Sequence, residues 1–163
     1  MFYPSKWSIS AATILCSVMF ASLVKAQTPF DVTYCGAGTM TMVSASKELT
    51  VFGYDFKSIV QSHHENKALD NCTFHAVGVK KIISGKQDET GYFKLMDPDG
   101  DIIIGEVTRV GEEEGTWKFL QGTGKWKGIK GSGKHSHTAG GKPIVPGTAQ
   151  SCSRNVGTFE LPK

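Results

Sequence analysis

Short runs in which apolar and polar residues alternate recur along the chain, and they constrain the fold more than any other feature. Successive side chains of a strand point to opposite faces, so this period of two is typical of a sheet with one buried face. Helical periodicity is hard to find, and Gly, Asp-Pro and charged turns separate the runs. Eight strands are predicted, at residues 38–43, 49–57, 72–82, 91–96, 102–110, 116–120, 125–131 and 156–161. This number suits a closed antiparallel barrel or a sandwich.

The segments between these runs carry turn residues. Asp97-Pro98-Asp99-Gly100 places Pro at the second turn position and Gly at the fourth, which predicts a hairpin between two strands. The same acids resemble the opening of a calcium loop, but Ile102 stands where such a loop needs Gly. Residues 135–154 contain two prolines and no period, so a long loop is expected there.

The first 26 residues have the pattern of a secretory signal peptide. An early cation, Lys6, precedes a mostly apolar run of 14 residues, and Val24-Lys25-Ala26 supplies small residues at a cleavage site. The run is shorter than the roughly 20 residues that cross a bilayer as a helix. We therefore expect a signal-peptide helix at 1–26, a single domain at 27–163, no membrane span after cleavage, and a secreted or periplasmic location.

Charge and cysteines narrow the function classes. The 137 residues that follow the signal segment have a net charge near +1, which does not favour nucleic acid as a partner. They contain Cys35, Cys72 and Cys152, so one disulfide can form in an oxidising compartment and one thiol is left over. Spacing does not separate the three possible pairs.

Five glycines between residues 122 and 133 form the most distinctive stretch. With Gly122-Thr123-Gly124, then Trp126 and Gly131, this stretch resembles the late strand pair of the allene oxide cyclase and dirigent-like barrels. The resemblance implies an eight-stranded, antiparallel, calycin-like barrel whose apolar interior encloses a ligand. The chain is most similar to small exported bacterial proteins of this barrel type. The functional acidic residues of either family cannot be matched to residues of this chain, so the resemblance implies a fold but no activity.

The alternation of side chains between the two faces of a strand identifies candidate ligand-binding residues. In the segment 102–108, one face carries Ile102, Ile104 and Glu106, and the other carries Ile103 and Val107. If the first face points inward, Glu106 is a buried acid and can anchor a ligand; otherwise it is solvated near the rim. The candidate ligand-binding residues are Tyr54, His75, Glu106 and Trp126.

Other motifs are better explained without a site. Gly128 to Lys134 has phosphate-loop spacing, but His135 replaces the Ser or Thr that would hold magnesium. His63-His64 and His135-x-His137 lie far apart in polar segments, which favours solvent-exposed histidines over a metal site. No metal, cofactor or nucleic acid is expected, and the lack of GxSxG argues against a hydrolase.

The leading hypothesis is therefore a barrel that binds a small apolar or amphipathic molecule. One alternative is an isomerase or cyclase that confines a lipid-like substrate, with Glu106 or His75 as the polar group. The other is a non-catalytic structural or interaction protein whose barrel is filled with side chains such as Phe52, Phe93 and Trp126.

Overall fold

Alternating side chains and short turns arrange the chain as a series of long strands. The computed structural model describes residues 27–161, and the predicted signal peptide at 1–26 lies outside that part. The described elements are β1 (Thr28–Ala45), β2 (Leu49–Ser62), β3 (Thr73–Ile83), β4 (Lys86–Met96), β5 (Ile102–Arg109), β6 (Gly115–Gly122), the 3-10 helix η1 (Gly124–Trp126), β7 (Lys130–Gly140) and β8 (Thr148–Glu160).

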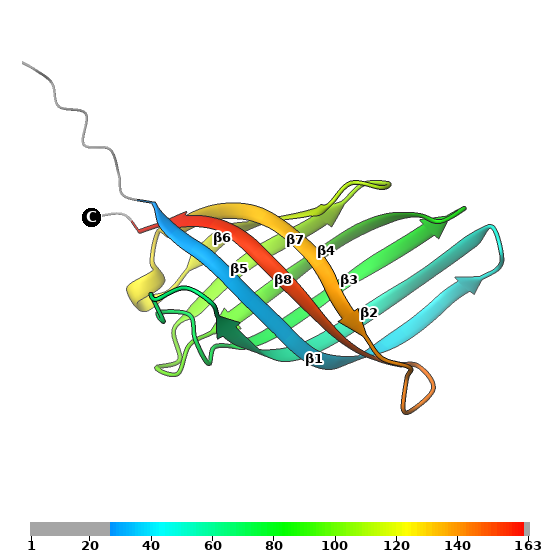
Figure 1. Ribbon diagram of the computed structural model, residues 1–163, viewed down its shortest axis with the longest axis horizontal. Coiled ribbons are helices and arrows are strands. Elements are labelled where there is room, and N and C mark those ends of the chain that lie inside the picture. The colour runs from blue at the N-terminus through cyan, green and yellow to red at the C-terminus, as the bar shows by residue number, and fades with distance from the viewer. Residues whose placement is uncertain (1–26, 162–163) are drawn as a thin grey trace, which may run out of the picture.

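The strands form a closed barrel. Each pairs antiparallel with its neighbours in sequence, and β8 returns to pair with β1 (Figure 1). The predicted all-β fold with eight antiparallel strands in a closed barrel is confirmed. Closure gives every strand a neighbour on both sides, although β6 and β7 pair over only four residues, Gly115–Lys118 with Ser132–His135.

Two of the predicted boundaries in the last third are wrong. Of the strand predicted at 125–131, residues 125–129 are not strand, because the chain forms η1 and a turn there and reaches β7 only at Lys130. Most of 135–154 is strand, and the loop between β7 and β8 spans only 141–147. The residues of β7 are mainly Gly, Lys, His and Ser, so the strand has no apolar alternation. Its backbone nevertheless pairs with β8 along most of its length, and that pairing needs no apolar side chain.

The barrel has one filled end. The turns β2–β3, β4–β5 and the segment with η1 lie at this end, where the side chains of Val32, Val60, Cys72, Leu95 and Ile103 are almost fully buried. Figure 1 shows η1 at the end of the barrel where β1 begins and β8 ends, and the β7–β8 loop at the opposite end. The hydrophobic core therefore occupies one half of the barrel.

Trp126 fills this end from η1. Its indole Nε1 donates a 2.8 Å hydrogen bond to Oδ2 of the buried Asp97. The other oxygen of Asp97 accepts from the backbone N–H groups of Asp99 and Asp101, so the predicted hairpin turn between β4 and β5 is present. Burial raises the pKa of Asp97, but hydrogen bonds from Lys125 and Trp126 outweigh it and lower the pKa overall.

A disulfide joins the first and last strands. Cys35 of β1 and Cys152 of β8 are directly opposed in the ladder and are bonded to each other. Cys72 is a buried free thiol, and burial raises its pKa to about 11. The bond reinforces the pair of strands that closes the barrel.

Candidate functional site

The unfilled half of the barrel contains a cavity of about 600 Å³. Its deep part is aromatic, because Tyr34 stacks on Phe74 with ring centroids 4.3 Å apart, and Phe74 stacks on Phe93 at 5.7 Å. Trp117 also lines it and packs against Phe119 of the core. These rings separate the cavity from the filled end and give it an apolar floor.

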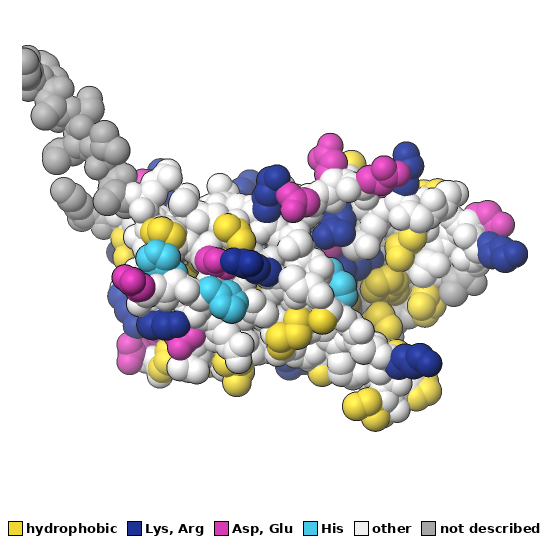
Figure 2. All heavy atoms as spheres, viewed as in Figure 1, with side chains coloured by type: hydrophobic (Ala, Val, Ile, Leu, Met, Phe, Trp, Pro, Cys, Tyr) yellow, Lys and Arg dark blue, Asp and Glu magenta, His cyan; other side chains and the backbone are white. Residues whose placement is uncertain are grey.

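The mouth of the cavity lies among the turns at the other end of the barrel. All of these turns expose aliphatic side chains, and the molecular surface at this end shows them as hydrophobic patches (Figure 2). The exposed side chains are Met42, Val43, Ile83, Val110, Ile144 and Val145. The rim of the cavity therefore presents aliphatic side chains beside exposed charged ones, among them Lys47, Glu48, Glu113 and Lys142.

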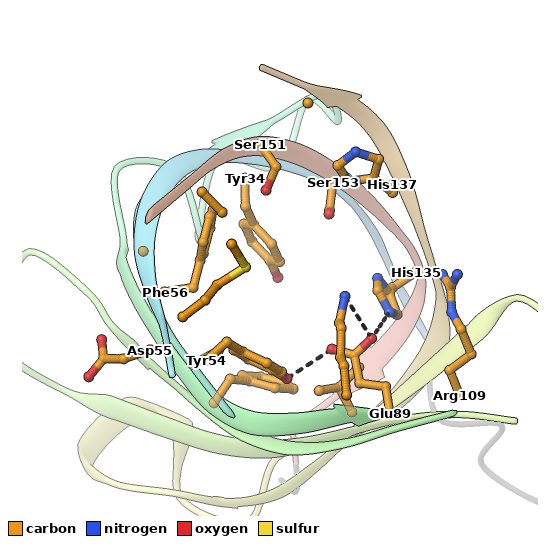
Figure 3. Close-up of a pocket in the computed structure, with 18 of the residues that line it drawn as sticks. Tyr34, Tyr54, Asp55, Phe56, Glu89, Arg109, His135, His137, Ser151 and Ser153 are labelled. Carbon is orange, nitrogen blue, oxygen red and sulfur yellow. Dashed lines mark hydrogen bonds and ion pairs between the residues drawn. The ribbon is translucent and has the colours of Figure 1, made fainter. Parts of the chain in front are cut away.

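A band of polar side chains crosses the cavity wall above the aromatic floor. Lys80, Glu89 and Arg109 are cross-strand partners on β3, β4 and β5, so they lie at one level of the barrel. Lys80, Glu89 and His135 of β7 line the cavity, whereas the Arg109 guanidinium lies beyond the strand that carries His135, away from the lumen (Figure 3). We call Tyr54, Lys80, Glu89 and His135 the polar belt.

Tyr54 contacts Glu89 directly. Its hydroxyl donates a 2.8 Å hydrogen bond to Glu89 Oε1. The Tyr54 ring lies across Gly78 and Gly91 on the next two strands, and a Cβ at either glycine would overlap the phenol. The two glycines thus provide the space through which Tyr54 reaches a residue two strands away.

Two nitrogen-bearing side chains approach the second oxygen of Glu89. Lys80 Nζ lies 3.2 Å from Glu89 Oε2, and His135 Nε2 lies 3.7 Å from the same oxygen, an ion-pair distance longer than a hydrogen bond. The His135 ring covers Gly115, where a Cβ would overlap the imidazole. Figure 3 shows Tyr54 and His135 each joined to Glu89 by a dashed line.

These contacts determine the protonation of Glu89. Burial by itself would raise its pKa, but His135, Lys80 and the Tyr54 hydroxyl outweigh burial and hold the pKa at about 2. Burial and the Glu89 charge raise the pKa of Tyr54. At neutral pH the cavity therefore contains an ionised carboxylate hydrogen-bonded to a neutral phenol.

Of the four residues predicted to bind a ligand, the cavity wall contains Tyr54 only. His75 lies on the outer face, with Nε2 3.1 Å from Asp55 Oδ1, and Asp55 points away from the lumen (Figure 3). Trp126 lies in the filled end.

Glu106 also lies on the outer face, where its Oε1 is 2.8 Å from Lys118 Nζ. The hypothesis that the Ile102 face of β5 points inward is wrong. The opposite face does so, with Ile103 in the core and Val107 in the cavity wall.

The expectation that His135 is a solvent-exposed loop residue is also wrong, because it lies on β7 and lines the cavity with a side chain that is only 11% exposed. His137 also lies on β7 and lines the cavity, but it is solvent-exposed as expected. Glu89 was missed because the fourth predicted strand began at residue 91, although β4 begins at Lys86. The sequence did contain a signal for Glu89. Glu89, Gly91 and Phe93 alternate along the strand, so Glu89 lies on the same face as Phe93, which was a candidate core residue.

Neither a metal centre nor a membrane-spanning helix is found in the part of the chain that the structure describes. Within residues 27–161 no three His, Cys, Asp or Glu side chains are grouped as metal ligands. No helix in that range has the length and apolar character needed to cross a bilayer.

Comparisons with known proteins support the architecture. No protein-family model and no curated protein sequence match the chain. The structure is similar to the pterocarpan synthase dirigent protein GePTS1, with a TM-score of 0.51 and 12% identity over 97% of this chain and 100% of that one. It is also similar to the pterocarpan synthase dirigent protein PsPTS1, with a TM-score of 0.51 and 13% identity over 85% of this chain and 97% of that one. At this identity the likeness shows the fold, a dirigent-like barrel.

Proposed function

We propose that this barrel binds one small apolar or amphipathic molecule in its cavity. The observation that carries the proposal is the cavity of about 600 Å³ with an aromatic floor and a polar belt. Ligand sites have volumes of roughly 300–1,000 Å³ and combine apolar walls with a few placed polar groups. A barrel filled with side chains does not fit this interior.

The apolar wall can supply the affinity. A ligand that buries roughly 300 Å² of apolar surface gains about 7 kcal/mol at 25 cal/mol per Å², before the costs of ordering. Those costs reduce the gain, and the polar belt adds hydrogen bonds that orient the molecule. Binding near the micromolar range, which corresponds to about 8 kcal/mol, is then within reach of a ligand that uses both parts.

The structural neighbours agree with a small-molecule role. Both are described as pterocarpan synthase dirigent proteins. The shared barrel supports a cavity that encloses an organic molecule, while the 12% and 13% identities carry no particular substrate over to this chain.

The proposed site of action is outside the cytoplasm, in a secreted or periplasmic location. The Cys35–Cys152 disulfide supports this proposal, since such bonds persist in oxidising compartments. Mass spectrometry of the protein from its native host should find an N-terminus near Gln27. A chain that still carries residues 1–26 would contradict the proposal.

Tryptophan fluorescence tests the binding proposal. Residues 27–163 contain only Trp117, in the cavity wall, and Trp126, in the filled end. Fatty acids and aromatic lipophiles titrated into Trp126→Phe protein should change the emission of Trp117. The matched Trp117→Phe variant should give little response. An unchanged Trp117 emission across the panel, with no binding by calorimetry, would overturn the proposal.

The polar belt also favours a second candidate function, a proton-transfer enzyme such as an isomerase or cyclase. His135 lines the cavity beside an ionised carboxylate, an arrangement that can orient an imidazole as a general acid or base. A ligand identified by fluorescence should then exchange a C–H hydrogen for deuterium in D₂O with wild-type protein. The exchange should disappear in His135→Gln, and a ligand that binds without exchange would exclude this candidate.

A further inference from the structure

Two polar atoms without a hydrogen bond lie close together in the polar belt. Glu89 Oε2 and His135 Nε2 are both buried, and neither makes a hydrogen bond within the described part of the chain. They are 3.7 Å apart, which is too far for a hydrogen bond between them. Both side chains line the cavity, and that of Glu89 is only 5% exposed. Buried polar atoms need partners, and a molecule in the cavity can supply one to both.

The other groups of the belt are already engaged. The Tyr54 hydroxyl donates to Glu89 Oε1 and so has used its proton. Lys80 Nζ lies 3.2 Å from Glu89 Oε2 as an ion pair and 5.7 Å from the centroid of the Tyr54 ring. The charges of Lys80 and Glu89 therefore balance each other, and the belt lacks a hydrogen-bonding group and not a counter-ion.

The chemistry of Glu89 and His135 specifies this group. Glu89 is ionised at neutral pH because its pKa is about 2, so Oε2 can only accept a hydrogen bond. An imidazole nitrogen beside a carboxylate is best placed with its proton on it, so His135 Nε2 donates. A hydroxyl both donates and accepts, and its oxygen can lie about 2.8 Å from each of the two atoms.

We propose that Glu89 and His135 form a hydroxyl subsite, and that the ligand of the barrel is a neutral amphipathic molecule whose O–H group bridges Glu89 Oε2 and His135 Nε2 while its apolar body lies on the aromatic floor. This proposal rests on the proposed function and specifies its ligand class. Glu89 and Phe93 share one face of β4, roughly 13 Å apart along the strand. The Tyr54 ring covers Gly91 between them, so the wall from the subsite to the floor is apolar.

Other head groups fit the subsite less well. A carboxylate has no proton to donate and meets the charge of Glu89, while Lys80 is already paired. An ammonium group donates but adds a second cation beside Lys80. An ether oxygen accepts from His135 without donating to Glu89, and it displaces water from the gap without replacing the hydrogen bonds of that water. The structure therefore favours a hydroxyl head over all three.

Four probes of equal carbon number test this preference: decan-1-ol, its isomer 1-methoxynonane, decanoate and decylamine, each below its solubility limit and micelle concentration. The alcohol and the ether contain the same atoms, so their difference measures the O–H group. Calorimetry with residues 27–163 should find decan-1-ol bound about tenfold more tightly than 1-methoxynonane, as one hydrogen bond to a charged group implies. Decan-1-ol should also bind more tightly than decanoate and decylamine.

Variants assign the preference to the two residues. Glu89→Leu should remove the difference between the isomers and leave 1-methoxynonane affinity unchanged, which also shows that the variant folds. His135→Phe removes the other partner and should reduce the difference. The matched control is Glu106→Gln, because Glu106 is a glutamate that pairs with a lysine on the outer face, and it should leave the preference intact.

The outcomes separate the subsite from the binding function. If 1-methoxynonane, decanoate or decylamine binds wild-type protein as tightly as decan-1-ol, the hydroxyl subsite is overturned and the binding function stands. A folded Glu89→Leu variant that keeps the full preference for decan-1-ol overturns the subsite in the same way. If none of the four probes binds, and the fluorescence panel is also silent, the binding function fails and the subsite fails with it.

Discussion

The Tyr54 hydroxyl and the Glu89 carboxylate, which are 35 residues apart in sequence, meet inside the barrel through a 2.8 Å hydrogen bond. Tyr54 comes from β2 and Glu89 from β4, so β3 passes between them and contributes only Gly78 beneath the ring. This contact, together with Lys80 and His135, turns one wall of an aromatic cavity into a polar site.

The ionised state of Glu89 should stabilise the fold in a pH-dependent way. Its pKa is about 2 in the folded chain against an ordinary 4.5, so the unfolded chain binds the proton first as the pH falls. The stabilisation is complete above pH 4.5 and is lost between about pH 4.5 and 2. Its size is on the order of 2–3 kcal/mol. Urea unfolding of Glu89→Gln should show a weaker loss of stability over this range than wild type.

Glu106→Gln is the matched control for this experiment. Glu106 is also a glutamate paired with a lysine, but it lies on the outer face, where an ion pair contributes about 0–1 kcal/mol. Its removal should leave the acid dependence unchanged. Equal acid dependence in wild type and Glu89→Gln would contradict the electrostatic role of Glu89.

A methyl group at Gly91 should displace Tyr54. The added Cβ would overlap the phenol hydroxyl, so Gly91→Ala should break the Tyr54–Glu89 hydrogen bond and lower the free energy of unfolding by about 1–3 kcal/mol. It should also weaken ligand binding, because Tyr54 lines the cavity. Thermal unfolding and ligand titration measure the two effects.

Gly53→Ala is the corresponding control, since a Cβ at Gly53 would meet no heavy atom closer than 3.8 Å. This substitution should leave both stability and binding close to wild type. If the two alanine variants behave alike, the space above Gly91 is not what positions Tyr54.

The disulfide should be a major source of stability. It joins residues separated by 117 positions, and removing a bond of this kind typically costs 2–5 kcal/mol. The double variant Cys35→Ser/Cys152→Ser should lose about this amount in urea unfolding. In protein that consists of residues 27–163 and keeps the disulfide, a thiol reagent should find no reactive cysteine when folded and one, Cys72, when unfolded. Two or three thiols in the unfolded, unreduced protein would contradict the pairing.

Trp126 should support the fold without taking part in binding. Trp126→Phe removes the indole N–H that Asp97 accepts, so the free energy of unfolding should fall by about 1–3 kcal/mol. Ligand affinity should stay the same, because Trp126 lies in the filled end and does not line the cavity. A large change in affinity would mean that the two ends of the barrel are coupled.

The sequence by itself determined the fold class. Alternation and turn residues predict eight strands, and the Asp97 turn joins β4 to β5 as expected. These features are local, because the period of two and the turn chemistry depend on residues adjacent in the chain. The strand β7 was the exception, since its polar sequence has no alternation and only pairing with β8 makes it a strand.

The tertiary structure alone decided which side chains meet in the cavity. A period of two separates the faces of a strand, but it does not say which face points inward when both carry aliphatic residues, as both do in β5. Closure of the barrel and the register between strands made that choice, placing Glu106 outside and Val107 in the cavity wall. The same register brings Glu89 to Tyr54, Lys80 and His135. Contacts of this kind depend on pairing between distant strands, which no local pattern in the chain encodes.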